Sequence, residues 1–345
     1  MSAPPVTVAL LDRRLLLVTG KGGTGKTSVT AALGLLAAQQ GRRVLACEVD
    51  AKGDLADFYE SPGLGFRPRE VQPRLFAMSM STEESLQEYV RLQLHLPAIA
   101  RIGPLARAFD FVATAAPGVR EILTVGKLAY EARERHYDLV VADASASGHV
   151  VGQLAAPRAI DELVRVGPIH DQTGWMLEVL GDPAVTGLVV VTTPEEMPVN
   201  ETIELVGRVR AETDVDVAAI VVNRVLPELF SRADEEVFEH LREPALTAAA
   251  AAAGAPPGDG TRAGPGGAAG ARPAGATGGG PFDTVLEAAR LAVTLRRTRA
   301  GHLDRLRDSV PANVPLLFVP YLFTRGHGLR TTAQTADALS AELGY

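Results

Sequence analysis

Cysteine and lysine are both scarce in this chain. Cys47 is the only cysteine among 345 residues. A single thiol cannot form a disulfide framework, a cysteine-clustered zinc site or an iron–sulfur cluster within one chain. Only four of the 34 basic residues are lysines, namely Lys21, Lys26, Lys52 and Lys127. The codon bias of a GC-rich genome accounts for the excess of arginine, so the positions of the few lysines are informative.

Long apolar runs and an excess of positive charge are also missing. No uncharged apolar run reaches the ~18 residues that a membrane-spanning helix needs. The apolar stretch Val6–Leu11 is followed at once by charged residues, which is not typical of a signal peptide. The formal charge is −7, which argues against a nucleic-acid partner or an anionic membrane surface. We therefore expect a cytoplasmic protein with no integral membrane segment and no nucleic-acid ligand.

Short apolar runs recur along the chain and predict buried strands. Runs without alternation are typical of strands covered on both faces, as in a parallel sheet. A helical pattern at Thr27–Gln40, which stops at Gly41, separates the first two runs. This alternation predicts an α/β fold with a doubly wound, mostly parallel sheet. The runs are Leu15–Thr19, Val44–Val49, Leu139–Ala142, Leu188–Thr192, Ala218–Val222 and Leu316–Val319.

Two regions interrupt the alternation within an expected single domain of residues 1–345. Residues 81–135 contain no strand-like run and predict a helical insertion, with ordinary core-facing helices as the alternative. Residues 245–281 contain 14 Ala, 11 Gly and 5 Pro, which together make 30 of the 37 residues. Such a composition buries too little apolar surface to offset the entropy of ordering. We expect a disordered Ala/Gly/Pro-rich insertion there.

A glycine-rich loop follows the first predicted strand. Residues 20–27 match G-x-x-x-x-G-K-[ST] at every fixed position and lie between a strand and a helix, as the motif requires. Its glycines let backbone N–H groups converge on phosphate oxygens, while Lys26 suits the β- and γ-phosphates and the Thr27 hydroxyl suits Mg²⁺. The sequence therefore predicts a P-loop NTPase. The candidate nucleotide-binding residues of this loop are Gly20, Lys21, Gly22, Gly23, Thr24, Gly25, Lys26, Thr27 and Ser28.

Aspartates end or follow two of the other predicted strands. Asp50 comes directly after Val44–Val49, and Asp143 directly after Leu139–Ala142. In open α/β sheets the carboxyl ends of the strands border the crevice that binds ligands. Asp50 could therefore orient the attacking water and accept its proton. Asp143 could belong to the Mg²⁺ shell, with helix capping as the alternative, and the candidate metal-binding residues are Thr27, Asp50 and Asp143.

The additional lysine of the loop, Lys21, makes it resemble the deviant form found in one large group of P-loop ATPases. Further motifs resemble the arsenite-efflux (ArsA) and tail-anchored-protein-targeting ATPase family, in particular its bacterial anion-transporting-ATPase-like branch. The family patterns are D-P-A-H-x-L in switch I and D-T-A-P-T-G-H in switch II. Asp50 and Leu55 match the first pattern, and Asp143, Gly148 and His149 match the second, with Ser147 for its threonine. Ala51, Gly53, Ala144 and Ala146 depart from them, and the lost prolines predict looser switch loops.

The resemblance implies ATP and Mg²⁺ as cofactors and a dimer with nucleotide at its interface. It implies that Lys21 reaches into the partner's site and acts in catalysis with Lys26 and Asp50. It places Gly148 at the γ-phosphate. The segments Val222–Pro227 and Val319–Leu322 resemble the family's base-binding loops, which implies that Asn223 and Pro320 contact adenine. The Asn223 amide offers both a donor and an acceptor for this purpose.

These expectations combine into a Mg²⁺-dependent ATP hydrolase that cycles as a homodimer, or as a heterodimer with a paralogue, to act on an unknown client protein. Two alternatives stay open: a nucleotide-gated scaffold with negligible turnover, and a partition or positioning ATPase. The metalloid-binding cysteines and the C-x-x-C zinc clamp of specialised family members are excluded, because Cys47 is alone.

Overall fold

A computed structural model describes residues 9–50, 53–94, 118–228, 281–324 and 326–345. The chain divides into two compact units, the first formed by Met1–Leu226 with His302–Tyr345 and the second by Pro227–Gly301. The predicted Ala/Gly/Pro-rich insertion at residues 245–281 lies outside the described residues, apart from its last residue, Pro281, where helix α11 begins.

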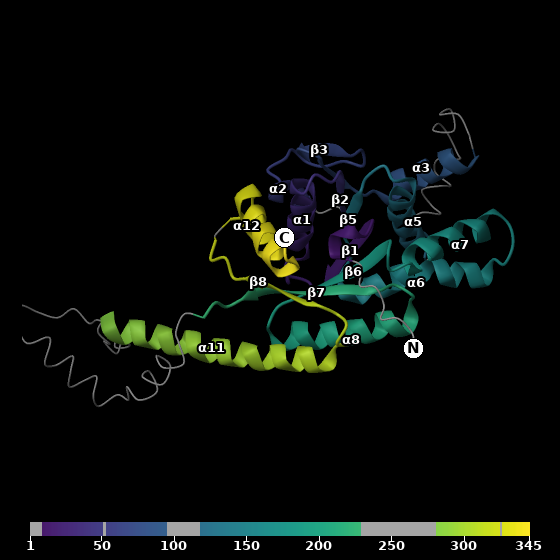
Figure 1. The fold of residues 1–345 in the computed structure, drawn as a ribbon. Coiled ribbons are helices and arrows are strands. Elements are labelled where there is room, and N and C mark those ends of the chain that lie inside the picture. The colour runs from purple at the N-terminus through teal and green to yellow at the C-terminus, as the bar shows by residue number, and fades with distance from the viewer. Residues whose placement is uncertain (1–8, 51–52, 95–117, 229–280, 325) are drawn as a thin grey trace, which may run out of the picture. The chain divides into compact units, whose positions relative to one another are not determined.

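A mostly parallel sheet of eight described strands forms the first unit (Figure 1). Its order is β3-β4-β2-β5-β1-β6-β7-β8, and only the β3–β4 pair is antiparallel. The predicted α/β class with a mostly parallel sheet is therefore confirmed. The strands are β1 (Leu15–Gly20), β2 (Val44–Glu48), β3 (Arg69–Gln72), β4 (Leu75–Ser79), β5 (Leu139–Asp143), β6 (Thr186–Thr192), β7 (Val217–Val225) and β8 (Leu316–Pro320).

The sequence patterns predicted six of these strands and missed β3 and β4. Five of the six apolar runs lie entirely within strands, and Val44–Val49 extends one residue beyond β2; five of these strands are mostly buried, and β8 is partly buried. The missed strand β3 is at the edge of the sheet, and its residues are half-buried or exposed, so it leaves no apolar run. β4 is short and pairs with both β2 and β3, which turns the chain back along the sheet edge before the helices that follow.

Helices cover both faces of the sheet. The described helices are a short 3-10 turn, η1 (Leu10–Asp12), and α1 (Lys26–Gln39), α2 (Asp54–Phe58), α3 (Thr82–Leu94), α5 (Val119–Glu134), α6 (Ser147–Leu163), α7 (Pro168–Gly181), α8 (Glu196–Glu212), α11 (Pro281–Ser309) and α12 (Leu329–Leu343). None of them is both long enough and apolar enough to cross a bilayer. The predicted helix at Thr27–Gln40 is α1, and Gly41 follows its end with a left-handed φ of +86°.

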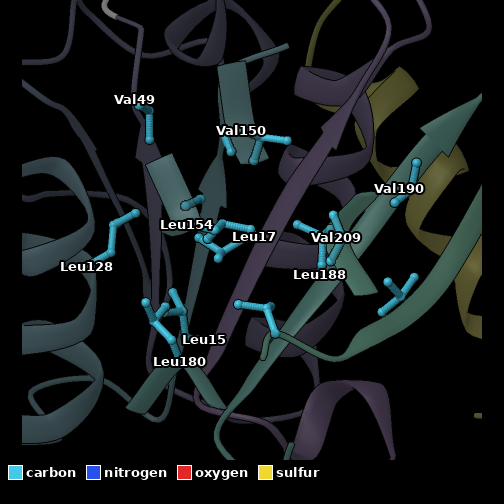
Figure 2. Close-up of a cluster of buried hydrophobic side chains, with 14 of the residues drawn as sticks. Leu15, Leu17, Val49, Leu128, Val150, Leu154, Leu180, Leu188, Val190 and Val209 are labelled. Carbon is cyan, nitrogen blue, oxygen red and sulfur yellow. The ribbon is translucent and has the colours of Figure 1, made fainter. Parts of the chain in front are cut away.

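The two hydrophobic cores lie on opposite faces of the sheet. Successive side chains of a strand point to opposite faces, so Leu16 and Val18 of β1 pack with α1, α2 and α12. Leu15 and Leu17 pack instead with residues of α5, α6, α7 and α8 (Figure 2). A central strand that is buried on both faces in this way holds the loop after it in a fixed position.

Lys127 of α5 connects the helices α3 and α5, both of which fall within the predicted insertion. Its Nζ lies 2.6 Å from Glu88 of α3 and 2.7 Å from Glu131 of α5, with the side chain only 8% exposed. Burial lowers the pKa of Lys127, but hydrogen bonds and charge from the two glutamates outweigh it, and the pKa is raised overall. The lysine therefore stays charged and ties α3 to α5.

We expect Leu188→Ala to lower the free energy of unfolding by about 2–5 kcal/mol, because Leu188 in β6 is fully buried and its removal leaves a cavity. Leu163→Ala makes the same chemical change at a side chain that is 83% exposed, and we expect a change below about 0.5 kcal/mol. Urea unfolding followed by circular dichroism measures both values. Equal losses in the two variants would contradict the assignment of the core.

Candidate nucleotide site

The carboxyl ends of β1, β2 and β5 meet at one edge of the sheet. β5 lies between the other two strands, and Glu48 of β2 pairs in register with Asp143 of β5. The Thr19 hydroxyl of β1 donates a hydrogen bond of 2.8 Å to the carbonyl of Ser145, just after β5. A cavity of about 540 Å³ opens at this edge, within the usual range for ligand sites, and the phosphate loop and the first residues of α1 form part of its wall.

Close contacts, one with backbone and one with a side chain, explain two glycines of the phosphate loop. A Cβ atom on Gly20 would lie 2.0 Å from the carbonyl oxygen of Val191, and one on Gly25 would lie 2.2 Å from Nδ2 of Asn223. Both residues also have positive φ, +146° and +96°. Only glycine satisfies both demands, so the loop is pressed against β6 and β7 while its amides stay at the N-terminus of α1.

Three residues expected at the phosphates and the metal come together in the cavity wall. Thr27 Oγ1 donates a hydrogen bond of 2.6 Å to Oδ2 of Asp143, and both residues line the cavity. Lys26 also lines it, and its Nζ lies 3.4 Å from the carbonyl oxygen of Lys21. A hydroxyl and a carboxylate oxygen are hard donors, so this pair fits Mg²⁺.

The cavity wall carries more negative than positive charge. Its lysine and arginine side chains are Lys26 and Arg224, whereas its carboxylates are Glu48, Asp50, Asp54, Asp57 and Asp143. Such a wall repels a bare nucleotide polyphosphate, so a divalent cation must accompany it. No group of three or more acidic, histidine or cysteine residues among the described residues is arranged to hold a metal by itself. This composition suits Mg²⁺, which is usually held by one or two carboxylates together with the substrate's phosphates.

Lys21 lies apart from the cavity wall. Its Nζ forms an ion pair with Oε1 of Glu201 in α8. The other carboxylate oxygen of Glu201 accepts a hydrogen bond of 3.3 Å from Ser147, the first residue of α6. Glu201 thus joins the phosphate loop to the segment that follows Asp143. No sequence pattern indicated this contact.

Asp50 lines the cavity and pairs with a residue that the sequence did not indicate. Its Oδ1 lies 3.3 Å from Nη2 of Arg120, in the first turn of α5. The side chains are 36% and 60% exposed, so the ion pair is at the surface of the site. It connects α5 with the aspartate expected to position water. Seventy residues separate the pair in sequence, and no local pattern reports such a contact.

Asn223 holds the phosphate loop in this structure. Its Nδ2 donates a hydrogen bond of 2.8 Å to the carbonyl of Thr24, and its Oδ1 accepts one of 2.9 Å from the amide of Arg224. The side chain is buried and does not line the cavity. Sequence reasoning passed over Arg224, which has a positive φ of +59° and does line the cavity.

Two other predicted ligand contacts, Gly148 and Pro320, do not line the cavity. Gly148 is exposed in the first turn of α6, and the next residue, His149, lines the cavity. Pro320 is exposed at the end of β8, whereas His327 further along the chain lines the cavity. Cys47 is buried in β2, and burial raises the pKa of its thiol, so a thiolate ligand is not available there.

Comparisons with known proteins show which family this chain resembles. The family model described as anion-transporting ATPase matches residues 13–176 and 168–244. ATPase BagA of Mycobacterium tuberculosis is 30% identical over 318 residues, which cover 89% of this chain and 87% of that protein. ATPase GET3 of Podospora anserina is 24% identical over 261 residues, which cover 64% of this chain and 77% of that protein.

The matched residues include the phosphate loop, both switch segments and Asn223, so the similarity extends over the whole cavity wall up to β7. The match with BagA also extends over most of both chains. The resemblance inferred from the motifs is therefore confirmed. This chain belongs to the anion-transporting ATPase family, and it is an ATP hydrolase.

Proposed function

We propose that this ATP hydrolase depends on Mg²⁺, and that its turnover drives a dimer between two states that act on a client protein. The observation that carries the proposal is the 2.6 Å hydrogen bond between Thr27 and Asp143 in the cavity wall. It brings a hydroxyl at the start of α1 to the carboxylate that ends β5. A Mg²⁺–nucleotide complex needs this pair of oxygen donors beside a phosphate loop.

The residues that line the cavity have different roles in the proposed hydrolysis. Lys26 and the amides of residues 20–28 hold the phosphates. Thr27 and Asp143 hold Mg²⁺, which when bound offsets the negative charge of the phosphate oxygens. Asp50 would orient the attacking water, take up its proton and contribute to holding the metal. Gly148 contacts the γ-phosphate after a small movement of the first turn of α6.

The position of Lys21 supports a dimer. The side chain is 31% exposed and held by Glu201, outside the wall of its own cavity. From there it is available to the nucleotide of a second subunit, as expected from the family resemblance. A cation that arrives only in the dimer couples association to hydrolysis, because it offsets charge that develops on the transferring phosphoryl group. The second subunit is either a copy of this chain or a paralogue.

The contact between Arg120 and Asp50 supports action on a client. α5 lies within the predicted helical insertion of residues 81–135, and its first turn contacts the aspartate proposed to position water. An exposed ion pair is worth at most about 1 kcal/mol, so a client that binds the insertion can exchange it at small cost. Asn223 and Pro320 remain the proposed contacts to the base, and Asn223 must then release its bond to Thr24.

We expect Asp50→Asn to lower kcat by about 10²–10⁴-fold, because the amide cannot accept the proton of the attacking water. The dissociation constant for ATP should change less than about threefold, since Lys26 and the loop amides are unaltered. Steady-state phosphate release and equilibrium binding of a fluorescent ATP analogue measure the two quantities. Asp304→Asn, at an exposed carboxylate paired with Arg307, is the control and should leave both unchanged. Turnover that survives in Asp50→Asn would refute this role.

Removal of Mg²⁺ with EDTA should weaken ATP binding by at least about tenfold, because five carboxylates line the cavity against two lysine and arginine side chains. Asp143→Asn should reduce that difference between Mg²⁺ and EDTA, since it removes one proposed ligand and one negative charge. Isothermal titration calorimetry in both conditions gives the two ratios. Equal affinity with and without Mg²⁺ in the unaltered protein would contradict a metal-dependent site.

ATP should shift Asp50→Asn from monomer to dimer in sedimentation velocity, since this variant traps the bound nucleotide. Lys21→Ala should retain ATP binding within about threefold, but lower kcat by at least about tenfold, because the partner's site then lacks its added cation. Arg208→Ala removes a cation from α8 that forms an exposed ion pair with Glu212, and serves as the control. A monomer in every nucleotide state would argue against the dimer.

A further inference from the structure

Glu48 is a buried carboxylate in the wall of the nucleotide cavity. It is the last residue of β2, two positions before Asp50, and its exposure is 2%. Among the described residues no cation lies within ion-pair distance of it. A buried charge without a cation is costly unless several hydrogen bonds satisfy it. Its environment therefore has to supply those bonds.

Three neutral donors satisfy the Glu48 carboxylate. Ser79 of β4 donates a hydrogen bond of 3.1 Å to Oε2. The backbone amide of Gly53 donates to the same oxygen at 3.1 Å, and the amide of Leu55 donates to Oε1 at 3.4 Å. Two of the three donors are thus backbone amides of switch I. Bonds from amides to a carboxylate are stronger than those between neutral groups, so they fix the segment effectively.

These bonds anchor the chain after Asp50, at Gly53 and Leu55. Before Asp50, the amide of Val49 donates a hydrogen bond of 3.1 Å to the carbonyl of Asp143 in β5. The chain that carries Asp50 is therefore fixed before it by β5 and after it by Glu48. Both anchors are on neighbouring central strands, which pair in register at Glu48 and Asp143.

The backbone of Gly53 is shaped for this contact. Its φ is +81°, a left-handed value that glycine adopts without strain, and it precedes the first residue of α2. This residue occupies the position at which the switch I pattern has histidine. The sequence predicted a looser switch I loop because its proline is absent, but Gly53 and Leu55 of this segment are anchored by Glu48.

We propose that Glu48 is a positioning residue for ATP hydrolysis, which holds switch I through the amides of Gly53 and Leu55 so that Asp50 faces the cavity. This inference rests on the proposed role of Asp50. Glu48 itself does not transfer a proton; it acts through the aspartate. A displacement of the water-positioning group by about 1 Å can reduce the rate by two orders of magnitude.

The direct test is Glu48→Gln, which keeps the size of the side chain but replaces one acceptor oxygen by a donor that faces a backbone N–H group. We expect kcat to fall about 10–100-fold while the dissociation constant for ATP changes less than about threefold. In the Asp50→Asn background, single-turnover hydrolysis should fall less than about threefold further, because Glu48 acts through Asp50. Glu131→Gln changes another buried carboxylate, outside the cavity, and should leave kcat unaltered.

Three results would overturn the inference. The first is a wild-type kcat in Glu48→Gln, and the second is a full additional loss in the Asp50→Asn background, which would mean that Glu48 acts independently. The third is a rise of the ATP dissociation constant in step with the loss of kcat, which a structural or metal-binding role would produce. Failure of the proposed function is distinct, because Asp50→Asn alone would then keep its turnover.

A pair of glycine variants tests the same contact without altering the buried charge. Gly53 and Gly41 have φ values of +81° and +86°, and a Cβ on either meets nothing within 4 Å. Substitution by alanine therefore imposes similar strain at both positions. Gly53→Ala should lower kcat about tenfold or more with ATP binding retained, whereas Gly41→Ala should not. Equal kcat values in the two variants would refute the positioning role, even if Glu48→Gln fails to fold.

Discussion

The hydrogen bond between Thr27 and Asp143 joins the two halves of the site, and the rest of the wall is arranged around it. It exists because β5 lies directly beside β1, so that the residue ending one strand faces the helix that follows the other. β2 lies on the other side of β5 and brings Asp50 to the same edge. A parallel sheet thus converts three distant sequence segments into one crevice.

Three cations in and around the site contact oxygen atoms of the protein. Lys21 pairs with Glu201, Arg120 pairs with Asp50, and Lys26 lies near the carbonyl of Lys21. Each of the two ion pairs links a loop of the site to a helix outside it.

Local patterns predicted the parts of the fold and site that depend on local physics. The glycines of the phosphate loop, the helix after it and the aspartates at the ends of buried strands all have signatures within a few residues. Contacts between distant residues have none: 180 positions separate Lys21 from Glu201, and 70 separate Arg120 from Asp50. β3 was also missed, because the residues of this edge strand are half-buried or exposed and therefore form no apolar run in the sequence.

In switch I the proline of the family pattern is absent, but the backbone at Gly53 and Leu55 is still restricted, through hydrogen bonds to Glu48. Proline restricts the backbone through its ring, whereas a buried carboxylate restricts it by accepting amide bonds. The second means depends on strand register, because Glu48 must stand beside Ser79 and Asp143 to be buried and satisfied. The anchoring of Gly53 and Leu55 in this chain therefore depends on three neighbouring strands, which a comparison of the loop sequence alone does not reveal.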